Sequence, residues 1–368
     1  MKSFSLKRMN TPVPSPILED VIADANLELA YQWLCHARKD SHYNNDVWHL
    51  RFHWQLLKEQ LRQAVLNGNY RFEPCRAIKA NGETIGVWSA RDALLIKALT
   101  LVLTPYLAPG LSPHCYHLAG RGGAKRCVRE VKHAVGDYPF VCRSDVNSYY
   151  ATIDHHILLK QLAERIPDER ILCLLQQMIT RLDNVDGNLY PVEIGISKGN
   201  PISPLLGALY LYSMDKALGD YCTKHQLKYF RFMDDWLVLC KTRYQLRRVV
   251  KLMNQCLAEV KQTKHPFRTC IGGIKANGFD FLGYRITPKI NEKISLAWKT
   301  IANHIGKLQQ LYEQGATAKR IAEYVKNWLQ WARGGIEIDL NEVLEIVWLC
   351  DLRRSFKMAF GIEFLFDR

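Results

Sequence analysis

Two adjacent aspartates, Asp234 and Asp235, interrupt the apolar stretch YFRFMDDWLVLC, a pattern typical of two strands joined at the pair. Burying two like charges is expensive unless a cation neutralises them. A hairpin with carboxylates at its tip is therefore suited to Mg²⁺, which prefers oxygen ligands. A third carboxylate would come from elsewhere, and Asp145, which ends the β-type run from Tyr138 to Val146, is the first candidate. A polar surface turn is the alternative interpretation.

Carboxylates gathered in this way indicate phosphoryl-transfer chemistry. Two metal ions about 3.5–4 Å apart would stabilise the attacking and leaving oxygens of such a reaction. The rest of the sequence decides whether this interpretation is preferred to the polar turn.

The pattern along the chain predicts a mixture of helices and short strands. Helical spacing is expected over residues 20–37, 48–66, 91–107, 154–165, 169–181, 202–218, 243–264 and 298–332. Short β-type runs are expected over 138–146, 228–241, 267–275 and 279–287, with a hairpin turn at Asn81-Gly82. This alternation predicts an α+β fold, in which helices gather against an antiparallel sheet.

The charge of the chain favours anionic partners. It has 50 Lys and Arg against 36 Asp and Glu, a formal net charge of +14, which points to phosphate-rich polymers or anionic membranes. No run approaches the roughly 18 apolar residues of a membrane-spanning helix, and the first residues, MKSFSLKRMN, lack the apolar core of a secretory signal. We therefore expect an intracellular chain with no membrane partner.

A glycine-rich turn leads into a basic helix between residues 119 and 134. Gly120, Gly122 and Gly123 are interleaved with Arg121 and followed by further cations, Lys125 and Arg126 among them. Such a turn is suited to holding phosphate. A solvated charged helix face is the alternative.

The 11 cysteines predict buried thiols rather than a metal site. No two of them have the C-x-x-C spacing of a zinc or redox site. Cys115 with His114 and His117 is the one local cluster of possible ligands, and it lacks a second ligand pair.

Four ordered blocks resemble the reverse transcriptases, especially bacterial ones of the group II intron type. They are SDVNSYYATIDHHIL from Ser144, GISKGNPISPLLGALYL from Gly195, FMDD at 232–235 and FDFLGY at 279–284. The resemblance extends from about residue 24 to about residue 335. It implies a polymerase right hand, and it favours the metal-binding interpretation of the aspartates.

The resemblance also implies roles for individual residues. Asp145, Asp234 and Asp235 would bind two Mg²⁺ ions, with the Val146 carbonyl as a further ligand, and Tyr150 would exclude a 2′-hydroxyl. Other residues would contact the nucleotide (Lys79, Arg91, Lys198, Gly199, Pro201, Ser203), the RNA template (Arg121, Lys125, Arg126) and the primer end (Phe281, Leu282, Gly283, Tyr284).

The chain departs from the family in two places that matter for function. Lys198 stands where the family usually has glutamine, and a lysine cannot copy the paired donor and acceptor of an amide. After residue 335 there is no zinc-bearing endonuclease module. Autonomous intron mobility is therefore not expected.

These observations lead to a prediction for the whole chain. Residues 1–140 would form an N-terminal extension and fingers, 141–290 the palm with a helical insertion at about 155–200, 291–335 a helical thumb, and 336–368 a C-terminal tail. The expected activity is RNA-directed addition of dNTPs to a 3′-hydroxyl. A compact, free-standing bacterial reverse transcriptase of this type resembles the defence-associated group, so we expect it to copy a companion non-coding RNA into DNA in antiphage defence in the bacterial cytoplasm. A partner protein or a homo-oligomer would complete the assembly. The alternatives are a retroelement enzyme, derived from an intron or a retron, and a maturase-like RNA-binding protein that does not polymerise.

Overall fold

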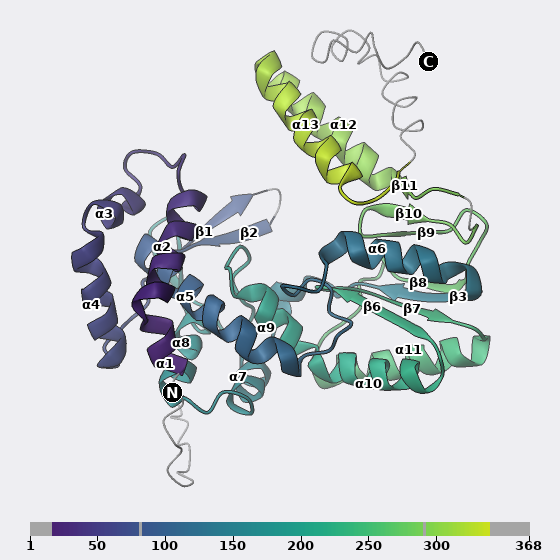
Figure 1. The fold of residues 1–368 in the computed structure, drawn as a ribbon, viewed down its shortest axis with the longest axis horizontal. Coiled ribbons are helices and arrows are strands. Elements are labelled where there is room, and N and C mark those ends of the chain that lie inside the picture. Colours follow the sequence, from purple (N-terminus) through teal and green to yellow (C-terminus); the bar gives the residue numbers. More distant parts are fainter. Residues whose placement is uncertain (1–16, 81–82, 290–291, 339–368) are drawn as a thin grey trace. The chain divides into compact units, whose positions relative to one another are not determined.

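A computed structural model describes residues 17–80, 83–289 and 292–338 (Figure 1). The described residues form two compact units. The first takes in the residues up to Ser112, Val146–Lys216 and Asn254–Thr263, and the second takes in Pro113–Asp145, Ala217–Met253 and the residues from Lys264 onward. The two units are defined by how compactly their residues pack and not by function. The boundaries of the fingers, palm and thumb therefore stay a prediction.

The core of the first unit is the long apolar helix α5 (Ala90–Leu107). Ten of its residues are buried, and the helices α1 (Ile17–Ile22), α2 (Asp24–Ala37) and α3 (Asp46–Phe52) pack on it, with α4 (Trp54–Leu66) beside α1 and α3. Within the described residues this is the one helix long and apolar enough to cross a membrane. Its apolar surface is used by the helices around it, as in a core helix.

The sheet of the first unit has the order β2-β1-β4-β5. Strands β1 (Cys75–Ala80) and β2 (Glu83–Val87) pair antiparallel, as the predicted hairpin requires; its turn, Asn81-Gly82, lies outside the described residues. Strands β4 (Leu182–Val185) and β5 (Asn188–Pro191) form a second hairpin. The prediction that residues 155–200 are helical is therefore wrong beyond α7 (His155–Ala163) and α8 (Glu169–Ile179).

The helix expected over residues 202–218 is divided at Leu211. Helix α9 (Ser203–Tyr210) belongs to the first unit, and α10 (Tyr212–Lys224) continues into the second, as the boundaries of the two units cut it. A short 3-10 helix, η3 (Tyr149–Thr152), lies earlier in the first unit.

The second unit contains a four-stranded antiparallel sheet with the order β6-β7-β3-β8. Its strands are β6 (Lys228–Phe232), β7 (Asp235–Cys240), β3 (Phe140–Ser144) and β8 (Cys270–Gly273). Helix α6 (Gly123–Ala134) covers one face, and α10 and α11 (Arg243–Glu259) cover the other (Figure 1). Trp236 to Cys240 are buried, so the central strand lies between two layers of helix.

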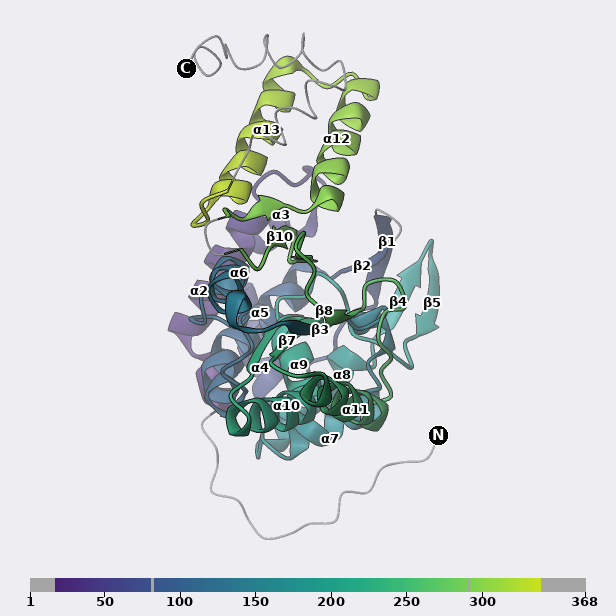
Figure 2. The ribbon, with the colours of Figure 1, turned by 90° about the vertical axis from the view of Figure 1, so that its right-hand side faces the viewer.

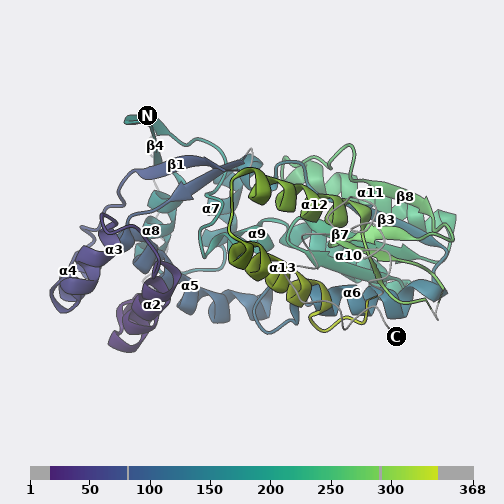
Figure 3. The same cartoon turned by 90° about the horizontal axis from the view of Figure 1, so that it is seen from above.

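A small sheet leads from this region to a pair of helices. Strands β9 (Phe279–Phe281), β10 (Tyr284–Ile286) and β11 (Ser295–Leu296) form it in the order β11-β10-β9. Helices α12 (Trp298–Glu313) and α13 (Ala318–Arg333) then lie side by side (Figures 2 and 3). Their shared core contains Leu308, Leu311, Ile321 and Val325.

Candidate active site

The sheet register of the second unit brings the three predicted aspartates to one end. Phe232 pairs with Asp235 across the β6–β7 hairpin, so Met233 and Asp234 form its two-residue turn. Ser144 at the end of β3 pairs with Trp236. Because β3 and β7 are antiparallel neighbours, Asp145 follows β3 at the end of the sheet where β7 begins with Asp235.

Arginines partly neutralise these carboxylates. Asp145 is 1% exposed, and its Oδ2 accepts a bond from Arg268 Nη1 at 2.9 Å. Arg143 Nη2 lies 3.4 Å from Asp235 Oδ1. The pKa of Asp235 is raised to about 6, chiefly by burial; Arg143 opposes this shift, and the carboxylates of Asp234 and Asp145 add to it. Burial therefore makes the charged form of Asp235 costly, and the neighbouring carboxylates add to this cost.

The donor atoms suit a hard cation. Asp145 Oδ1 is buried and has no hydrogen-bond partner among the described residues, a costly condition for a carboxylate oxygen. In the part of the chain that the structure describes, no three His, Cys, Asp or Glu side chains already form a group that could hold a metal ion. Asp235 and Asp145 each pair with an arginine, so a cation would compete with Arg143 and Arg268 for these carboxylates.

In the first unit, Tyr150 and the loop 195–200 lie together. Ile196 N donates to Tyr150 O at 2.8 Å. Ser203, at the start of α9, is buried, and its hydroxyl donates to Ser197 O at 2.7 Å. The hydroxyl of Ser203 therefore fixes the loop that carries Lys198 and Gly199 and that is followed by Pro201.

The remaining predicted nucleotide contacts lie near this loop or are paired elsewhere. A Cβ added at Gly199 would come within 3.2 Å of Ile85 Cγ2, so the loop lies against β2. Lys79 is exposed on the neighbouring strand β1. Arg91 lies on α5, where it forms an ion pair with Glu73 at 3.2 Å. A triphosphate would have to compete with this carboxylate for Arg91.

Comparison with known proteins identifies the family. A family model described as reverse transcriptase (RNA-dependent DNA polymerase) matches residues 89–286, more than half of the chain. This chain belongs to the reverse transcriptase family. Protein YkfC of Escherichia coli (strain K12) is 24% identical in an alignment of 271 residues that covers 62% of this chain and 71% of YkfC. The predicted α+β polymerase fold is confirmed at the level of fold class.

Two further relatives match less of their own length. Group II intron-encoded protein LtrA of Lactococcus lactis subsp. cremoris is 20% identical over 164 residues, 43% of this chain and 27% of LtrA. A chain of a partial Cas6-RT-Cas1–Cas2 complex is 20% identical, with a TM-score of 0.41 over 70% of this chain and 45% of that one. The predicted resemblance to bacterial, group II intron-like reverse transcriptases is confirmed.

In this reverse transcriptase, the four residues predicted to grip the primer form the β9–β10 turn. Phe281 and Tyr284 are buried, whereas Leu282 and Gly283 form the turn with φ of 48° and 86°. Gly283 O accepts bonds from Ala297 N at 3.0 Å and from Thr300 Oγ1 at 2.9 Å. The turn is therefore attached to the start of α12, and only Leu282 and Gly283 are partly exposed.

The predicted RNA-binding cations have different surroundings. The Lys125 ammonium donates to Tyr284 Oη and Trp331 O, and lies 4.5 and 4.6 Å from the centres of these two rings. Burial lowers the pKa of Lys125 to about 8. Arg126 forms an ion pair with Glu130. Lys125 therefore has an internal role, and RNA binding stays a prediction for Arg121 and Arg126.

Two other cations of α6 also bind main-chain carbonyls. Arg129 Nη1 donates to Gly335 O at 2.8 Å, and Lys132 Nζ donates to Thr287 O at 3.0 Å and Lys289 O at 2.8 Å. Together with Lys125 they lie three or four residues apart and share one helix face. This face joins α6 to the β9–β10 hairpin and to the end of α13.

The functional residues that sequence reasoning missed are Arg143 and Arg268. Arg143 interrupts the apolar strand β3 next to Ser144, and a buried-strand cation was the available signal. Arg268 follows β7 and α11 in the chain and meets Asp145 only through the fold, so no local pattern marked it.

Proposed function

We propose that this reverse transcriptase carries out its chemistry with Asp145, Asp234 and Asp235. The observation that carries the proposal is that the three aspartates lie at one end of the sheet. One buried Asp145 oxygen has no partner among the described residues, and the pKa of Asp235 is raised. Reverse transcriptases generally use divalent metal ions. The three side chains and the Val146 carbonyl would hold two Mg²⁺ ions, which would neutralise charge on the reacting phosphates.

The ionisation of Asp235 and two ion pairs are compatible with metal binding by these carboxylates. With a pKa of about 6, Asp235 is ionised at pH 8 and available as a ligand. Arg143 and Arg268 hold Asp235 and Asp145 in ion pairs, which limits the repulsion within the group. The nucleotide would be contacted by the loop 195–200, by Lys79 and by Tyr150.

Substitution of the hairpin aspartates tests this assignment. Asp234→Asn and Asp235→Asn keep the shape of the side chain and remove its charge, so synthesis of oligo(dT) on poly(rA) with Mg²⁺ should fall by several orders of magnitude. Asp220→Asn, an exposed aspartate of α10, is the matched control and should retain full activity. Equal activity in either hairpin variant would overturn the assignment.

We further propose that the template is a companion non-coding RNA and that the biological role is antiphage defence in the bacterial cytoplasm. The formal net charge of +14 supports an RNA partner, and the defence role rests on the resemblance described above. A partner protein or a second copy of the chain would complete the assembly.

A phage challenge separates this role from that of a retroelement. Cells carrying the gene with its flanking DNA should survive infection, cells with Asp234→Asn should not, and sequencing should recover DNA copied from one flanking RNA. Copying of an intron or retron RNA without protection would instead support the retroelement alternative. Protection that survives Asp234→Asn would favour a maturase-like RNA-binding role.

A further inference from the structure

The segment His114–His117 lies along the outer edge of the sheet in the second unit. Arg231 N donates to His114 O at 2.9 Å, and Tyr116 N donates to Arg231 O at 2.9 Å. Cys115 and Arg231 thereby form a parallel bridge. Strand β6 is the edge strand in the order β6-β7-β3-β8, so this segment covers its edge just before the aspartate turn.

Two side chains extend from this edge to the turn itself. His117 Nδ1 accepts a bond from Met233 N at 2.9 Å, and Arg231 Nη1 donates to Met233 O at 2.7 Å. Both main-chain polar groups of Met233 are thus bound by side chains. Because Nδ1 accepts, the ring of His117 carries its proton on Nε2.

The turn has physical reasons to need such support. Met233 has a φ of 55°, in the left-handed region, which is unfavourable for a residue with a side chain. The next two residues, Asp234 and Asp235, carry charges that repel each other. Without contacts that favour this conformation, the turn would relax and move both carboxylates.

Burying the side chain of Arg231 costs free energy. Its side chain is fully buried, and its second terminal nitrogen donates to Cys115 Sγ at 2.9 Å. A buried guanidinium is expensive unless its donors are satisfied. Its bonds to Met233 and to Cys115 are among the contacts that satisfy it, so its burial is coupled to the shape of the turn.

We propose that His117 and Arg231 are positioning residues that fix the Met233-Asp234-Asp235 turn in the geometry needed for nucleotide addition. The inference rests on the proposed catalytic role of the aspartates. It also gives a structural role to Cys115 and His117, two members of the local cluster noted in the sequence. Loss of the bonds from His117 and Arg231 to Met233 would misplace the two carboxylates. The nucleotide contacts of the first unit would stay unchanged.

The matched pair His117→Leu and His117→Asn tests the proposal. Leucine removes the acceptor, whereas the asparagine oxygen can occupy the position of Nδ1. In single-turnover synthesis on poly(rA)–oligo(dT), His117→Leu should lower the maximal rate about ten- to a hundredfold, with the apparent Kd for dTTP unchanged. His117→Asn should restore most of the rate, and the exposed control His133→Leu should match the parent.

A second measurement reports on the turn without requiring activity. In hydrogen exchange, the peptide containing the Met233 amide should exchange faster in His117→Leu than in the parent, and His117→Asn should restore its protection. Thermal unfolding should stay close to that of the parent in both variants. Arg231→Met should reproduce the loss of rate where it folds.

The outcomes separate this inference from the proposed function. If Asp234→Asn is inactive while His117→Leu keeps the parent rate and exchange, the positioning role is overturned and the active-site assignment stands. If Asp234→Asn is active, the assignment itself fails. Equal loss in His117→Leu and His117→Asn would overturn the role of the acceptor.

Discussion

At the scale of the residue, Tyr150 is the side chain whose packing bears most directly on substrate choice. Its ring stacks on Tyr149 with centroids 5.4 Å apart, and a Cβ added at Gly207 would come within 3.1 Å of both rings. Tyr149 is buried, and its hydroxyl donates to Gly207 O at 2.5 Å. Tyr150 is only half-buried, so one of the two stacked rings keeps an accessible surface.

We therefore expect Tyr150→Val to relax sugar discrimination. Removing a steric wall should raise the use of UTP relative to dTTP on poly(rA) by about tenfold or more, measured as the ratio of kcat/KM values. Tyr149→Phe removes the hydroxyl that binds Gly207 O but keeps the ring, and it should leave the ratio unchanged. A constant ratio in Tyr150→Val would show that Tyr150 only packs against its neighbour.

The aspartates could be predicted at this scale and their supporting residues could not. Asp234 and Asp235 are adjacent in an apolar stretch. Burying such a like-charged pair is costly without a cation, so the sequence alone marks it as a candidate site. Arg231 and Cys115 are separated by 116 positions and meet only through the sheet edge. Such contacts depend on strand register and order, which no local pattern contains.

At the scale of the element, the predicted helices and strands are largely present, and the main error was the β4–β5 hairpin. Every residue of β5 is exposed, so the strand lacks the alternation that marks a half-buried strand. The usable signal was Asp186-Gly187, with φ of 51° and 92°, because Asp-Gly favours a two-residue hairpin turn. Helices were predicted more reliably, because a helix that buries one face shows apolar residues at helical spacing in its sequence.

The cationic face of α6 gives a prediction for Lys125. Lys125→Met keeps the length of the side chain but removes the donor that joins Tyr284 to the end of α13, where Ala332 O also lies 3.4 Å away. Stability should fall by about 1–3 kcal/mol, and affinity for a primer–template duplex should fall with it. Urea unfolding and duplex titration would measure both. Parent-like behaviour in both assays would contradict the internal role.

Helices α12 and α13 enclose a histidine that predicts a pH dependence. His304 is 2% exposed, stacks on Trp328 with centroids 3.8 Å apart, and has a pKa lowered to about 4 by burial. Above pH 6.5 the folded and unfolded states are both neutral. As pH falls toward 4 the unfolded state gains a proton first, so stability should fall by about 3 kcal/mol.

The comparison with His304→Phe isolates this contribution. Urea unfolding of the parent and the variant should differ in its pH dependence between pH 7.5 and pH 4, and the variant should lose less stability over this range. His156→Phe, which changes an exposed histidine of α7, should behave as the parent does. Identical pH profiles for the parent and His304→Phe would contradict the prediction.

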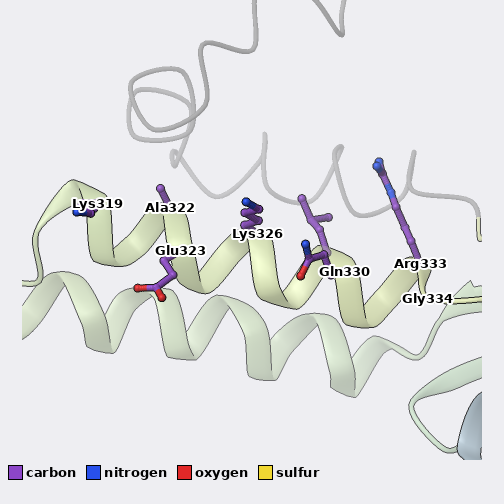
Figure 4. Close-up of a pocket in the computed structure, with 8 residues that line it drawn as sticks. Lys319, Ala322, Glu323, Lys326, Gln330, Arg333 and Gly334 are labelled. Atoms are coloured by element: carbon purple, nitrogen blue, oxygen red, sulfur yellow. The ribbon is translucent and has the colours of Figure 1, made fainter. Parts of the chain in front are cut away.

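At the scale of the whole molecule, the basic side chains fall into two groups. Some bind other parts of the protein, and others are expected to contact nucleic acid. Lys319, Lys326 and Arg333 line a groove along α13, and Arg333 points away from α12 (Figure 4). Arg121, which the family resemblance places on the template path, lies in the turn before α6. Lys125 is held by carbonyls and aromatic rings of its own chain.

This division predicts which charges set the salt dependence of RNA binding. Each lost contact with a single-strand phosphate lowers the slope of log K against log salt by about 0.7. Arg121→Gln should therefore reduce the slope by about that amount, and the triple change of Lys319, Lys326 and Arg333 to Gln by up to about three times as much. Lys251→Gln, on the exposed face of α11, is the control.

Lys125→Met should weaken binding without changing the slope, because its ammonium releases no counterion when RNA binds. A slope that changes with Lys125 and not with Arg121 would reverse the assignment of the two residues.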